Sequence, residues 1–255
     1  MEILEELKIL GSCRIQDLAR RLDVSEETIR RNVRSLAEQG IVRKVHGGVY
    51  LAEAVQEPTF SQRMNVNPDA KRRVAAAVAA RIRNGDSLIL DIGSTTAFVA
   101  RALRNHHDLF VVTNSIAVAQ SLATRNNNRV FMAGGELRPH DAGAFGREAI
   151  NFVRQFNVQH AILSAAAIDA TTGFMLFDMQ EAEFSREIMR RSNHVLVAAD
   201  SSKFGGLAPI RIAPPEDVDL LITDAAPPAD LQDFLKQANV AVEIASDVPA
   251  PDMSE

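Results

Sequence analysis

Apolar residues recur at helical spacing in the first part of the chain. The stretch "RIQDLARRL" (residues 14–22) carries an apolar side chain at every third or fourth position, which predicts a helix. After a short break, "VSEETIRRNVRSL" (residues 24–36) resumes the helical period. Ser25 can cap this second helix, and Glu26 and Glu27 place negative charge in its first turn, where the helix dipole favours it. The pattern therefore predicts a helix, a tight turn and a second helix.

The second predicted helix separates apolar from polar residues. Ile29, Val33 and Leu36 fall on one face at about 100 degrees per residue, so this face can pack against a core. The other face and its flank carry polar groups, which are Glu27, Thr28, Arg30, Arg31, Arg34 and Ser35. The helix therefore directs its arginines away from its packed side.

Alternating apolar and basic residues follow this helix. The stretch "IVRKVHGGVY" (residues 41–50) alternates around a pair of glycines, which predicts a short β-hairpin. The polar side of the hairpin would carry Arg43, Lys44 and His46. Two helices and a hairpin together predict a small domain over residues 1–55.

The next segment is polar and lacks periodicity. Residues 56–70 contain two prolines, and this composition predicts an interdomain linker. Asn67 and Pro68 also suit the N-cap and the first position of a helix. A larger domain is then expected over residues 71–246, and the polar, proline-containing residues 247–255 are predicted to form a disordered tail.

Short apolar runs, separated by helical patterns, mark the larger domain. Runs without polar alternation are buried on both faces, which is typical of parallel strands covered by helices. The pattern therefore predicts an α/β fold with a Rossmann-like, doubly wound parallel sheet. The runs are "SLILD", "LFVVT", "RVFMAG", "AILSAA", "HVLVAAD" and "LLITD".

Small polar residues follow four of these runs. Ligands bind such sheets beyond the carboxyl ends of the strands. Hydroxyl and backbone N–H groups at a helix start suit a phosphate or another oxyanion, and Lys203 can add positive charge. A serine or threonine at one such turn is more often only a helix cap, but here four turns converge at one edge. We expect a ligand site formed by Asp91, Gly93, Ser94, Thr95, Thr96, Thr113, Asn114, Gly134, Gly135, Glu136 and Lys203.

The composition is that of an ordinary globular protein, with 46% apolar and 24% charged residues. No apolar run is long enough to span a membrane, and no export signal is visible, so a cytoplasmic location is expected. Cys13 is the only cysteine, which excludes an internal disulfide, and the histidines are not spaced to bind zinc. Neither a metal nor a cofactor is predicted.

Charge is distributed unevenly along a chain whose formal net charge is −5. Residues 14–44 hold eight Arg or Lys against five Asp or Glu, so this stretch carries +3 and the remainder −8. An anion-binding module joined to a body that repels anions would show this asymmetry. Because a helix fits the major groove and arginine bonds guanine edges, double-stranded DNA is the expected partner. The alternative is a surface helix whose arginines pair with Glu27 and Glu38.

Residues 15–51 carry a resemblance that favours DNA. The stretch "IQDLARRLDVSEETIRRNVRSLAEQGIVRKVHGGVYL" closely resembles the winged helix-turn-helix of the DeoR family of bacterial transcriptional repressors. Asn32 stands where the family usually has Asp, beside the packed face, so we expect an altered hydrogen bond within the domain rather than altered base reading. The expected DNA-binding residues are Ser25, Glu27, Thr28, Arg30, Arg31, Arg34, Arg43, Lys44 and His46.

The larger domain also resembles this family, in the C-terminal effector domain that is related in fold to ribose 5-phosphate isomerase and glucosamine 6-phosphate deaminase. The matching stretches are "DIGSTT", "TNS", "AGGELRP", "GAFG", "ID", "EAEFSRE" and "DSSKFG". The resemblance adds Gly143 and Asp169 to the expected site, and implies a sugar phosphate or related metabolite as ligand. Ala167, Ser185 and Ser201 depart from the usual Gly, Lys and His, which adds a methyl group and removes a cation in or near the site.

These features favour a repressor of a carbohydrate-utilisation operon, working as a homodimer or homotetramer and released from its operator by the metabolite. The alternative is a sugar-phosphate isomerase or deaminase fused to a DNA-binding module, with Asp91, Glu136, Asp169 or Asp200 as base. A DNA-binding scaffold with a vestigial pocket is a third possibility. No acid is paired with an orienting group, so no catalytic residue is predicted.

Overall fold

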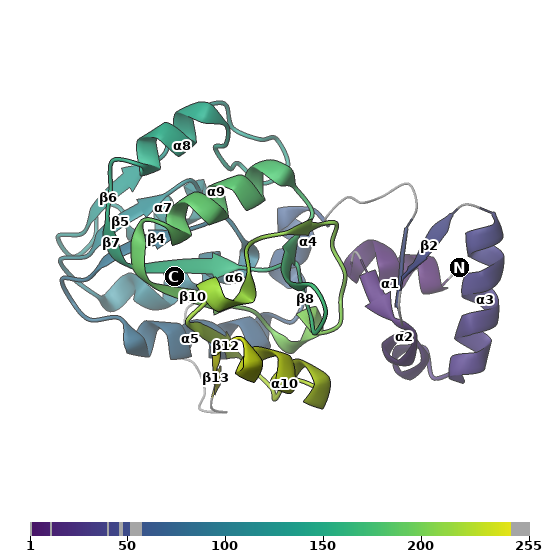
Figure 1. Ribbon diagram of the computed structural model, residues 1–255. Helices are drawn as coiled ribbons and strands as arrows, with labels where there is room; N and C mark the ends of the chain where they lie inside the picture. The colour runs from purple at the N-terminus through teal and green to yellow at the C-terminus, as the bar shows by residue number, and fades with distance from the viewer. Residues whose placement is uncertain (1, 11, 40, 46–47, 52–57, 246–255) are drawn as a thin grey trace.

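The computed structural model describes residues 2–10, 12–39, 41–45, 48–51 and 58–245. A small N-terminal domain lies beside a larger α/β body (Figure 1). The body is built on a parallel sheet, and the small domain combines helices with a short antiparallel sheet. The predicted fold class is therefore confirmed.

The N-terminal domain has the helix, turn, helix and hairpin that the sequence predicted. Its elements are α1 (Glu2–Leu10), β1 (Ser12–Arg14), α2 (Ile15–Arg21), α3 (Glu26–Glu38), β2 (Val42–Val45) and β3 (Gly48–Leu51). The hairpin of β2 and β3 is extended by β1, so the sheet order is β1-β3-β2. The sequence did not predict β1, since a strand of three residues is too short to show alternation.

The orientation of α3 follows from its apolar face. Ile29 and Val33 are buried in the core of the domain, and Leu36 packs against that core. Burying one such side chain contributes about 1.5–3 kcal/mol, so the packing decides which face is left to solvent. The Oγ of Ser25 accepts a hydrogen bond from the backbone N–H of Thr28 at 3.2 Å, which confirms the predicted cap.

Asn32 makes a hydrogen bond within α3. Its Nδ2 donates to the backbone carbonyl oxygen of Thr28 at 2.9 Å. An ionised aspartate at this position has no donor and cannot form the bond. The departure from the family pattern therefore changes a bond inside the domain, as the position of Asn32 indicated.

The segment before the body contains more regular structure than its composition indicated. α4 (Phe60–Asn65) lies within the expected linker, and α5 (Pro68–Arg81) also begins inside it. A capping box starts α4: the backbone N–H of Gln62 donates to Thr59 Oγ1 at 3.3 Å, and the backbone N–H of Thr59 donates to Gln62 Oε1 at 2.9 Å. These local bonds support a helix in a segment that has no apolar period.

All the predicted apolar runs form strands of one parallel sheet, in the order β13-β12-β10-β7-β4-β5-β6. The strands are β4 (Ser87–Leu90), β5 (Phe110–Thr113), β6 (Arg129–Met132), β7 (Val158–Ser164), β10 (Ser192–Ala198), β12 (Leu220–Thr223) and β13 (Ala241–Ile244). Only β13 among them was not predicted. It is an edge strand with mostly exposed residues, so it has no continuous buried run.

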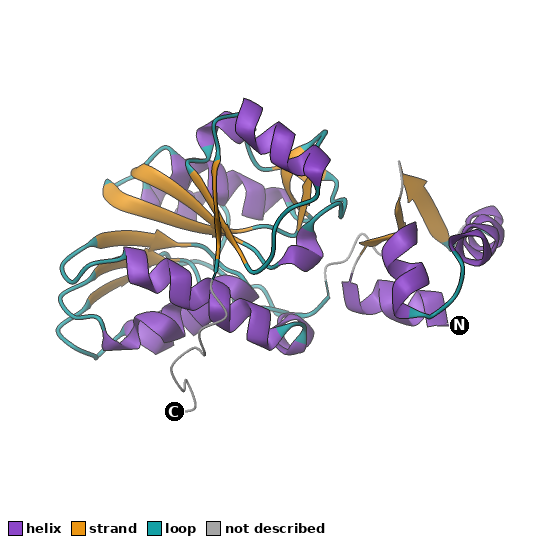
Figure 2. Ribbon diagram, turned by 90° about the horizontal axis from the view of Figure 1, so that it is seen from below, coloured by secondary structure: helices purple, strands orange, loops and turns teal. Residues whose placement is uncertain are grey.

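Helices cover both faces of this sheet (Figure 2). α5, α6 and α7 pack on one face with Leu88 and Leu90, and α8, α9 and α10 pack on the other with Ile89. The helices not yet given are α6 (Ser94–Ala102), η1 (Leu103–Asn105), α7 (Ile116–Leu122), α8 (Arg147–Val153), α9 (Met179–Met189), η2 (Ser201–Lys203), η3 (Pro215–Asp217) and α10 (Ala229–Gln237). Burial on both faces explains why these strands read as continuous apolar runs.

A small second sheet follows β7. It consists of β8 (Ala167–Asp169), β9 (Gly173–Leu176) and β11 (Ile210–Arg211), in the antiparallel order β11-β9-β8. The sequence did not predict this sheet, because its strands are short and β9 is buried throughout. Its position matters for function, since it contacts both the sheet edge and the N-terminal domain.

Candidate nucleic-acid interface and effector site

Helix α3 lies on the side of the N-terminal domain that faces away from the body (Figures 1 and 2). Thr28 is partly buried by the turn that begins the helix. The other residues of α3 and its cap that were expected to bind DNA are exposed, and they are Ser25, Glu27, Arg30, Arg31 and Arg34. The side chains that the sequence assigned to DNA are therefore accessible.

Two of the α3 arginines have acidic neighbours on the same helix. Arg30 forms an ion pair with Glu26 at 3.0 Å, and Arg34 lies 3.9 Å from Glu38. Exposed pairs of this kind contribute only about 0.3–0.5 kcal/mol, so a phosphate can displace the carboxylate. Arg31 makes no hydrogen bond or ion pair within the part of the chain that the structure describes. The surface-helix alternative therefore gives Arg31 no role.

The hairpin contributes one described basic side chain. Lys44, on β2, is exposed. Arg43 belongs to the same strand, but its side chain lies outside the described residues, and so does the whole of His46. The predicted DNA-binding role of the hairpin therefore rests, in the structure, on Lys44.

A groove between the domains brings together residues that the sequence assigned to different sites. Arg30 and Lys44 line it from the N-terminal domain, and Asp169 and Asp230 line it from the body. Arg14 extends into this groove, where its guanidinium lies 4.0 Å from Asp169 and 3.9 Å from Asp230. Asp169, which was expected at the effector site, therefore lies at the junction of the domains.

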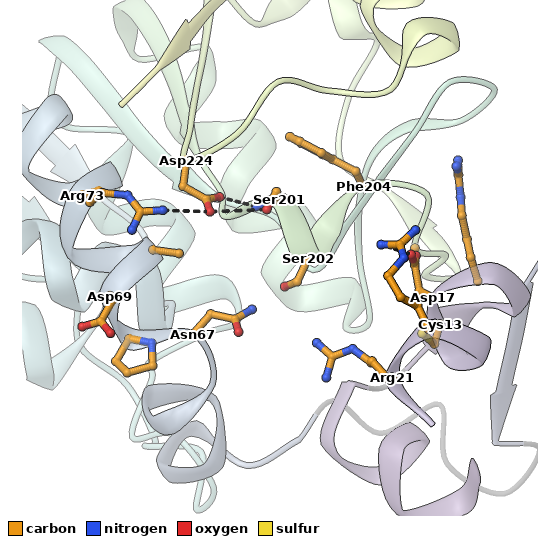
Figure 3. Close-up of a pocket in the computed structure, with 15 residues that line it drawn as sticks. Cys13, Asp17, Arg21, Asn67, Asp69, Arg73, Ser201, Ser202, Phe204 and Asp224 are labelled. Carbon is orange, nitrogen blue, oxygen red and sulfur yellow. Dashed lines mark hydrogen bonds and ion pairs between the residues drawn. The ribbon is translucent and has the colours of Figure 1, made fainter. Parts of the chain in front are cut away.

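Arg14 also borders a pocket of about 630 Å³ between α2 and the body (Figure 3). On the body side, Arg73 lies 3.4 Å from Asp224, whose other oxygen accepts a hydrogen bond from the backbone N–H of Ser201 at 2.6 Å. On the other side, Arg21 pairs with a glutamate of α1 at 3.1 Å. Each of these two arginines is therefore already paired with a carboxylate of the protein.

As predicted, the polar turns of the body meet at one edge of the main sheet. They follow β4, β5, β6 and β10, and the carboxyl ends of these strands point the same way because the strands are parallel. The turn after β7 lies between those after β4 and β10, and it adds Ser164 to the edge. Ser164 was not among the predicted site residues, since no hydroxyl cluster follows it.

Asp91 is a buried carboxyl group at this edge, with only 4% of its surface exposed. Its Oδ2 accepts a hydrogen bond from the backbone N–H of Ser164 at 2.9 Å, whereas its Oδ1 has no partner among the described residues. Burial raises the pKa of Asp91 well above its ordinary value, and hydrogen bonds from Ser164 and Thr96 only partly oppose that effect. A buried acceptor without a partner costs about 1–3 kcal/mol, which a ligand that donates to it would recover.

Asn114 presents a second such acceptor at the end of the neighbouring strand. Its Nδ2 donates to the backbone carbonyl oxygen of Ala144 at 3.1 Å, which fixes the orientation of the amide because a carbonyl only accepts. Its Oδ1 is buried without a partner among the described residues. Thr113 differs, since its Oγ1 accepts from the backbone N–H of Ser115 at 3.0 Å and so holds the turn.

Asp91 and Asn114 line the same narrow cavity, which is too narrow in this structure for a water molecule. The remaining lining residues are Ile92, Phe145, Leu176, Glu181, Phe184 and Ser185. Ser185 is one of the positions at which the sequence departs from the family pattern. The cavity therefore combines two unpartnered oxygens, apolar walls and the hydroxyl group of Ser185.

The turn between β4 and α6 is shaped by close packing. Residues 93–96 are all buried, and the Oγ1 of Thr96 donates to the carbonyl oxygens of Asp91 and Gly93, each at 3.1 Å. A Cβ atom on Gly93 would lie 2.2 Å from the Oγ of Ser164, so a larger residue does not fit. Thr96 and Gly93 thus hold the turn that positions Asp91, and neither lines the cavity.

The glycines of the loop after β6 were expected at one site, but they lie in different surroundings. Gly134, Gly135 and Glu136 are exposed and do not line the cavity of Asp91. Gly143 is buried, and an added Cβ would lie 2.6 Å from the Ile92 side chain. Its role is to let the loop pack closely beside a cavity wall.

Arg138, in the same loop, is a partly buried cation that was not among the predicted site residues. Its guanidinium pairs with Asp141, Asp178 and Glu181 and lies 4.2 Å from the centre of the Phe145 ring. Burial raises the pKa of Asp141, but the hydrogen bonds and charge of Arg138 outweigh burial and hold that pKa below its ordinary value. This ion-pair cluster could not be recognised from the sequence, because Arg138 and Glu181 are 43 residues apart.

Lys203 lies at the same sheet edge but outside this cavity, in the turn after β10. Its neighbour Asp200 is buried, and its Oδ1 accepts a hydrogen bond from Asn67 Nδ2 at 3.1 Å. Burial raises the pKa of Asp200, but the charge of Lys203 and nearby hydrogen bonds outweigh burial, so the pKa lies below its ordinary value. The expected effector residues thus fall into a cavity, its supporting turns and an outer rim.

Two negative findings concern the described part of the chain. It contains no group of three or more His, Cys, Asp or Glu side chains arranged to hold a metal ion. None of its helices combines the length and apolar character needed to cross a membrane.

Family models match both domains of the chain. The DeoR-like helix-turn-helix domain matches residues 1–55, and the DeoR C terminal sensor domain matches residues 66–225. The chain is 36% identical over 242 residues to the glycerol-3-phosphate regulon repressor of Escherichia coli (strain K12), which covers 95% of this chain and 96% of the relative. It is also 36% identical over 232 residues to the HTH-type transcriptional repressor CsqR of the same organism, with 91% and 89% covered.

Among solved structures, the body is similar to ribose 5-phosphate isomerase A from Methanocaldococcus jannaschii, with a TM-score of 0.40, 18% identity, and 54% of this chain and 55% of that chain covered. The relatives that match along nearly their whole length are named as transcriptional repressors, which favours a regulator over the isomerase or deaminase alternative. An exposed basic α3, a sensor domain and similarity along nearly the whole chain agree: this protein is a DNA-binding transcriptional regulator of the DeoR family.

Proposed function

We propose that this regulator represses a carbohydrate-utilisation operon in the cytoplasm, and that a sugar phosphate or a related metabolite releases it from its operator. The observation that carries the proposal is the coexistence, in one chain, of exposed arginines on α3 and two unpartnered buried acceptors in the body. The first suits DNA, and the second suits a small polar ligand. A relative that is similar along its whole length is named for a glycerol-3-phosphate regulon.

For operator binding, we propose that α3 enters the major groove. Arg31 and Arg34 face solvent there and can reach base edges or phosphates, and Lys44 of the hairpin adds a phosphate contact. A homodimer or homotetramer would place two such helices on half-sites about 34 Å apart, one turn of DNA. The operator is then expected to be a paired repeat.

For release, we propose that the metabolite binds at the sheet edge around Asp91 and Asn114, with Lys203 at the rim. A ligand shifts the protein between two states only if it binds one of them better. The cavity is too narrow for water in this structure, so a ligand would favour a wider arrangement. Such an arrangement would move β9, whose Leu176 lines the cavity, and with it the sheet that contacts the N-terminal domain.

The test is a mobility-shift assay of the full-length protein on DNA from upstream of its own gene, at two salt concentrations. Each reaction is run with and without members of a panel of sugar phosphates. We expect specific binding that weakens at higher salt, because phosphate contacts release counterions, and that one panel member abolishes. Binding that is unspecific, or that no metabolite of the panel changes, would contradict the proposal.

A further inference from the structure

The unpartnered acceptors of the effector cavity define what a ligand must offer there. Asp91 Oδ1 and Asn114 Oδ1 belong to residues that are 4% and 0% exposed, and neither oxygen has a hydrogen-bond partner among the described residues. Their other atoms are held by Ser164 and Ala144, so the free oxygens cannot turn away. A ligand group that donates a hydrogen bond to each would satisfy both.

The charge of the cavity argues against a phosphate inside it. Its ionisable lining residues, Asp91 and Glu181, are both acids, and no lysine or arginine lines it. The nearby guanidinium of Arg138 is already paired with Asp141, Asp178 and Glu181. An ionised phosphate oxygen only accepts hydrogen bonds, so against Asn114 Oδ1 it would meet another acceptor without a compensating cation.

A hydroxyl group fits where a phosphate does not. It donates to a carboxylate or amide oxygen, and it can also accept from the carboxyl group of Asp91 when that group is protonated. The apolar side chains of Ile92, Phe145 and Leu176 would contact the carbon chain between hydroxyls. Ser185, which also lines the cavity, carries a neutral hydroxyl group and agrees with this chemistry.

We propose that Asp91 and Asn114 are specificity residues that bind hydroxyl groups of the effector, so that the cavity takes the polyhydroxyl carbon chain and any phosphate lies outside it. This inference rests on the proposed function and adds the orientation of the ligand. It predicts that the protein selects its effector by the positions of the hydroxyl groups that enter the cavity. It also predicts that phosphate by itself does not bind in the cavity.

The test measures binding to the full-length protein by isothermal titration calorimetry. The probes are glycerol 3-phosphate, ribose 5-phosphate, their unphosphorylated parents, the 2-deoxy analogue of ribose 5-phosphate and inorganic phosphate. The variants are Asn114→Leu, which removes an acceptor, and Asp91→Asn, which removes the ionisable carboxyl group and turns an amide donor toward the cavity. Asn128→Leu is the matched control, because Asn128 lies just before β6, at the opposite edge of the sheet.

We expect Asn114→Leu to weaken the tightest-binding probe by about tenfold or more, the size of one buried hydrogen bond, and Asn128→Leu to leave it unchanged. Asp91→Asn should change affinity by less than about tenfold, because a hydroxyl can accept as well as donate. Circular dichroism of each variant shows whether it is folded. If Asn114→Leu does not fold, two other measurements test the proposal. Ribose 5-phosphate should then bind more tightly than its 2-deoxy analogue, and Asp91→Asn should change affinity by less than about tenfold.

The proposal is overturned if inorganic phosphate competes with the organic probes and Asp91→Asn strengthens phosphate binding, since phosphate would then lie in the cavity. It is also overturned if Asn114→Leu, once folded, binds every probe as the wild type does. The mobility-shift assay is scored separately. If a probe binds without releasing DNA, the proposed function fails while the assignment of the cavity stands.

Discussion

The guanidinium of Arg14 lies 4.0 Å from the carboxylate of Asp169, an ion pair that joins the N-terminal domain to β8. β8 pairs with β9, and Leu176 of β9 lines the cavity of Asp91 and Asn114. One short sheet therefore contacts both the proposed effector cavity and the DNA-binding domain. If the effector binds in this cavity and shifts β9, we expect the shift to displace Asp169, the partner of Arg14.

The first prediction concerns this route from the cavity to Arg14. We expect Arg14→Ala to reduce the effect of the effector on operator affinity while leaving the melting temperature nearly unchanged, since a partly exposed ion pair contributes at most about 1 kcal/mol. Arg21→Ala is the control, because Arg21 pairs within the N-terminal domain. The measurement is operator affinity with and without effector for both variants. An undiminished response in Arg14→Ala would rule out this route.

The second prediction concerns operator binding. Arg31 is exposed and makes no bond within the described residues, so Arg31→Ala should not affect folding. We expect operator affinity to fall by about 10- to 100-fold, the value of one base-reading arginine. Arg125→Ala, at an exposed arginine of the body, should bind as the wild type does. A large loss of thermal stability in Arg31→Ala would show instead that the side chain is structural.

The third prediction concerns the rim of the effector site. Lys203 lies outside the narrow cavity at the same sheet edge, where it can meet a phosphate. We expect Lys203→Ala to bind the operator as the wild type does. The effector concentration needed to release it should rise by about tenfold or more, because a charge-assisted hydrogen bond to the effector is lost. Lys236→Ala, on the exposed side of α10, is the control. An unchanged response would remove Lys203 from the site.

The fourth prediction compares two glycines at the sheet edge. A Cβ on Gly93 would lie 2.2 Å from Ser164 Oγ, whereas a Cβ on Gly134 would meet nothing within 4 Å. We expect Gly93→Ala to lower the free energy of unfolding by about 1–3 kcal/mol, as overpacking does. Gly134→Ala should stay within about 0.5 kcal/mol of the wild type. Urea unfolding of both variants checks this, and equal stabilities would contradict the close packing at Gly93.

The fifth prediction concerns pH. Burial raises the pKa of Asp91 well above 3.8, so between 3.8 and the raised value the folded protein holds a proton that the unfolded chain has lost. Stability therefore falls as pH rises through this window, by up to about 1.4 kcal/mol per pH unit. Asp91→Asn lacks the group, so wild type and variant should diverge as pH rises above about 4. The lowered pKa values of Asp141 and Asp200 act in the opposite direction and cancel in this comparison.

Urea unfolding of wild type and Asp91→Asn at a series of pH values from about 4 to 8 measures this divergence. A difference in the free energy of unfolding that stays constant across the series would show that Asp91 titrates normally in the folded protein.

The sequence by itself determined the local elements of this protein. The apolar period around Ile29 and Val33 and the cap at Ser25 predicted α3 and its exposed face, because helical spacing and capping depend on neighbours along the chain. The apolar runs predicted six of the seven strands of the main sheet. The parallel arrangement also placed Asp91 and Asn114 at one edge, since parallel strands end together.

Only the tertiary structure decided which of the predicted site residues act together. It separated Lys203 and Asp169 from Asp91, and brought Arg138 to Glu181, a residue 43 positions away. Such pairs depend on how strands are ordered and how loops fold back, and no local pattern records that. The unpartnered oxygens of the cavity are likewise a property of packing, because a side chain lacks a partner only when its surroundings, from distant parts of the chain, leave it none.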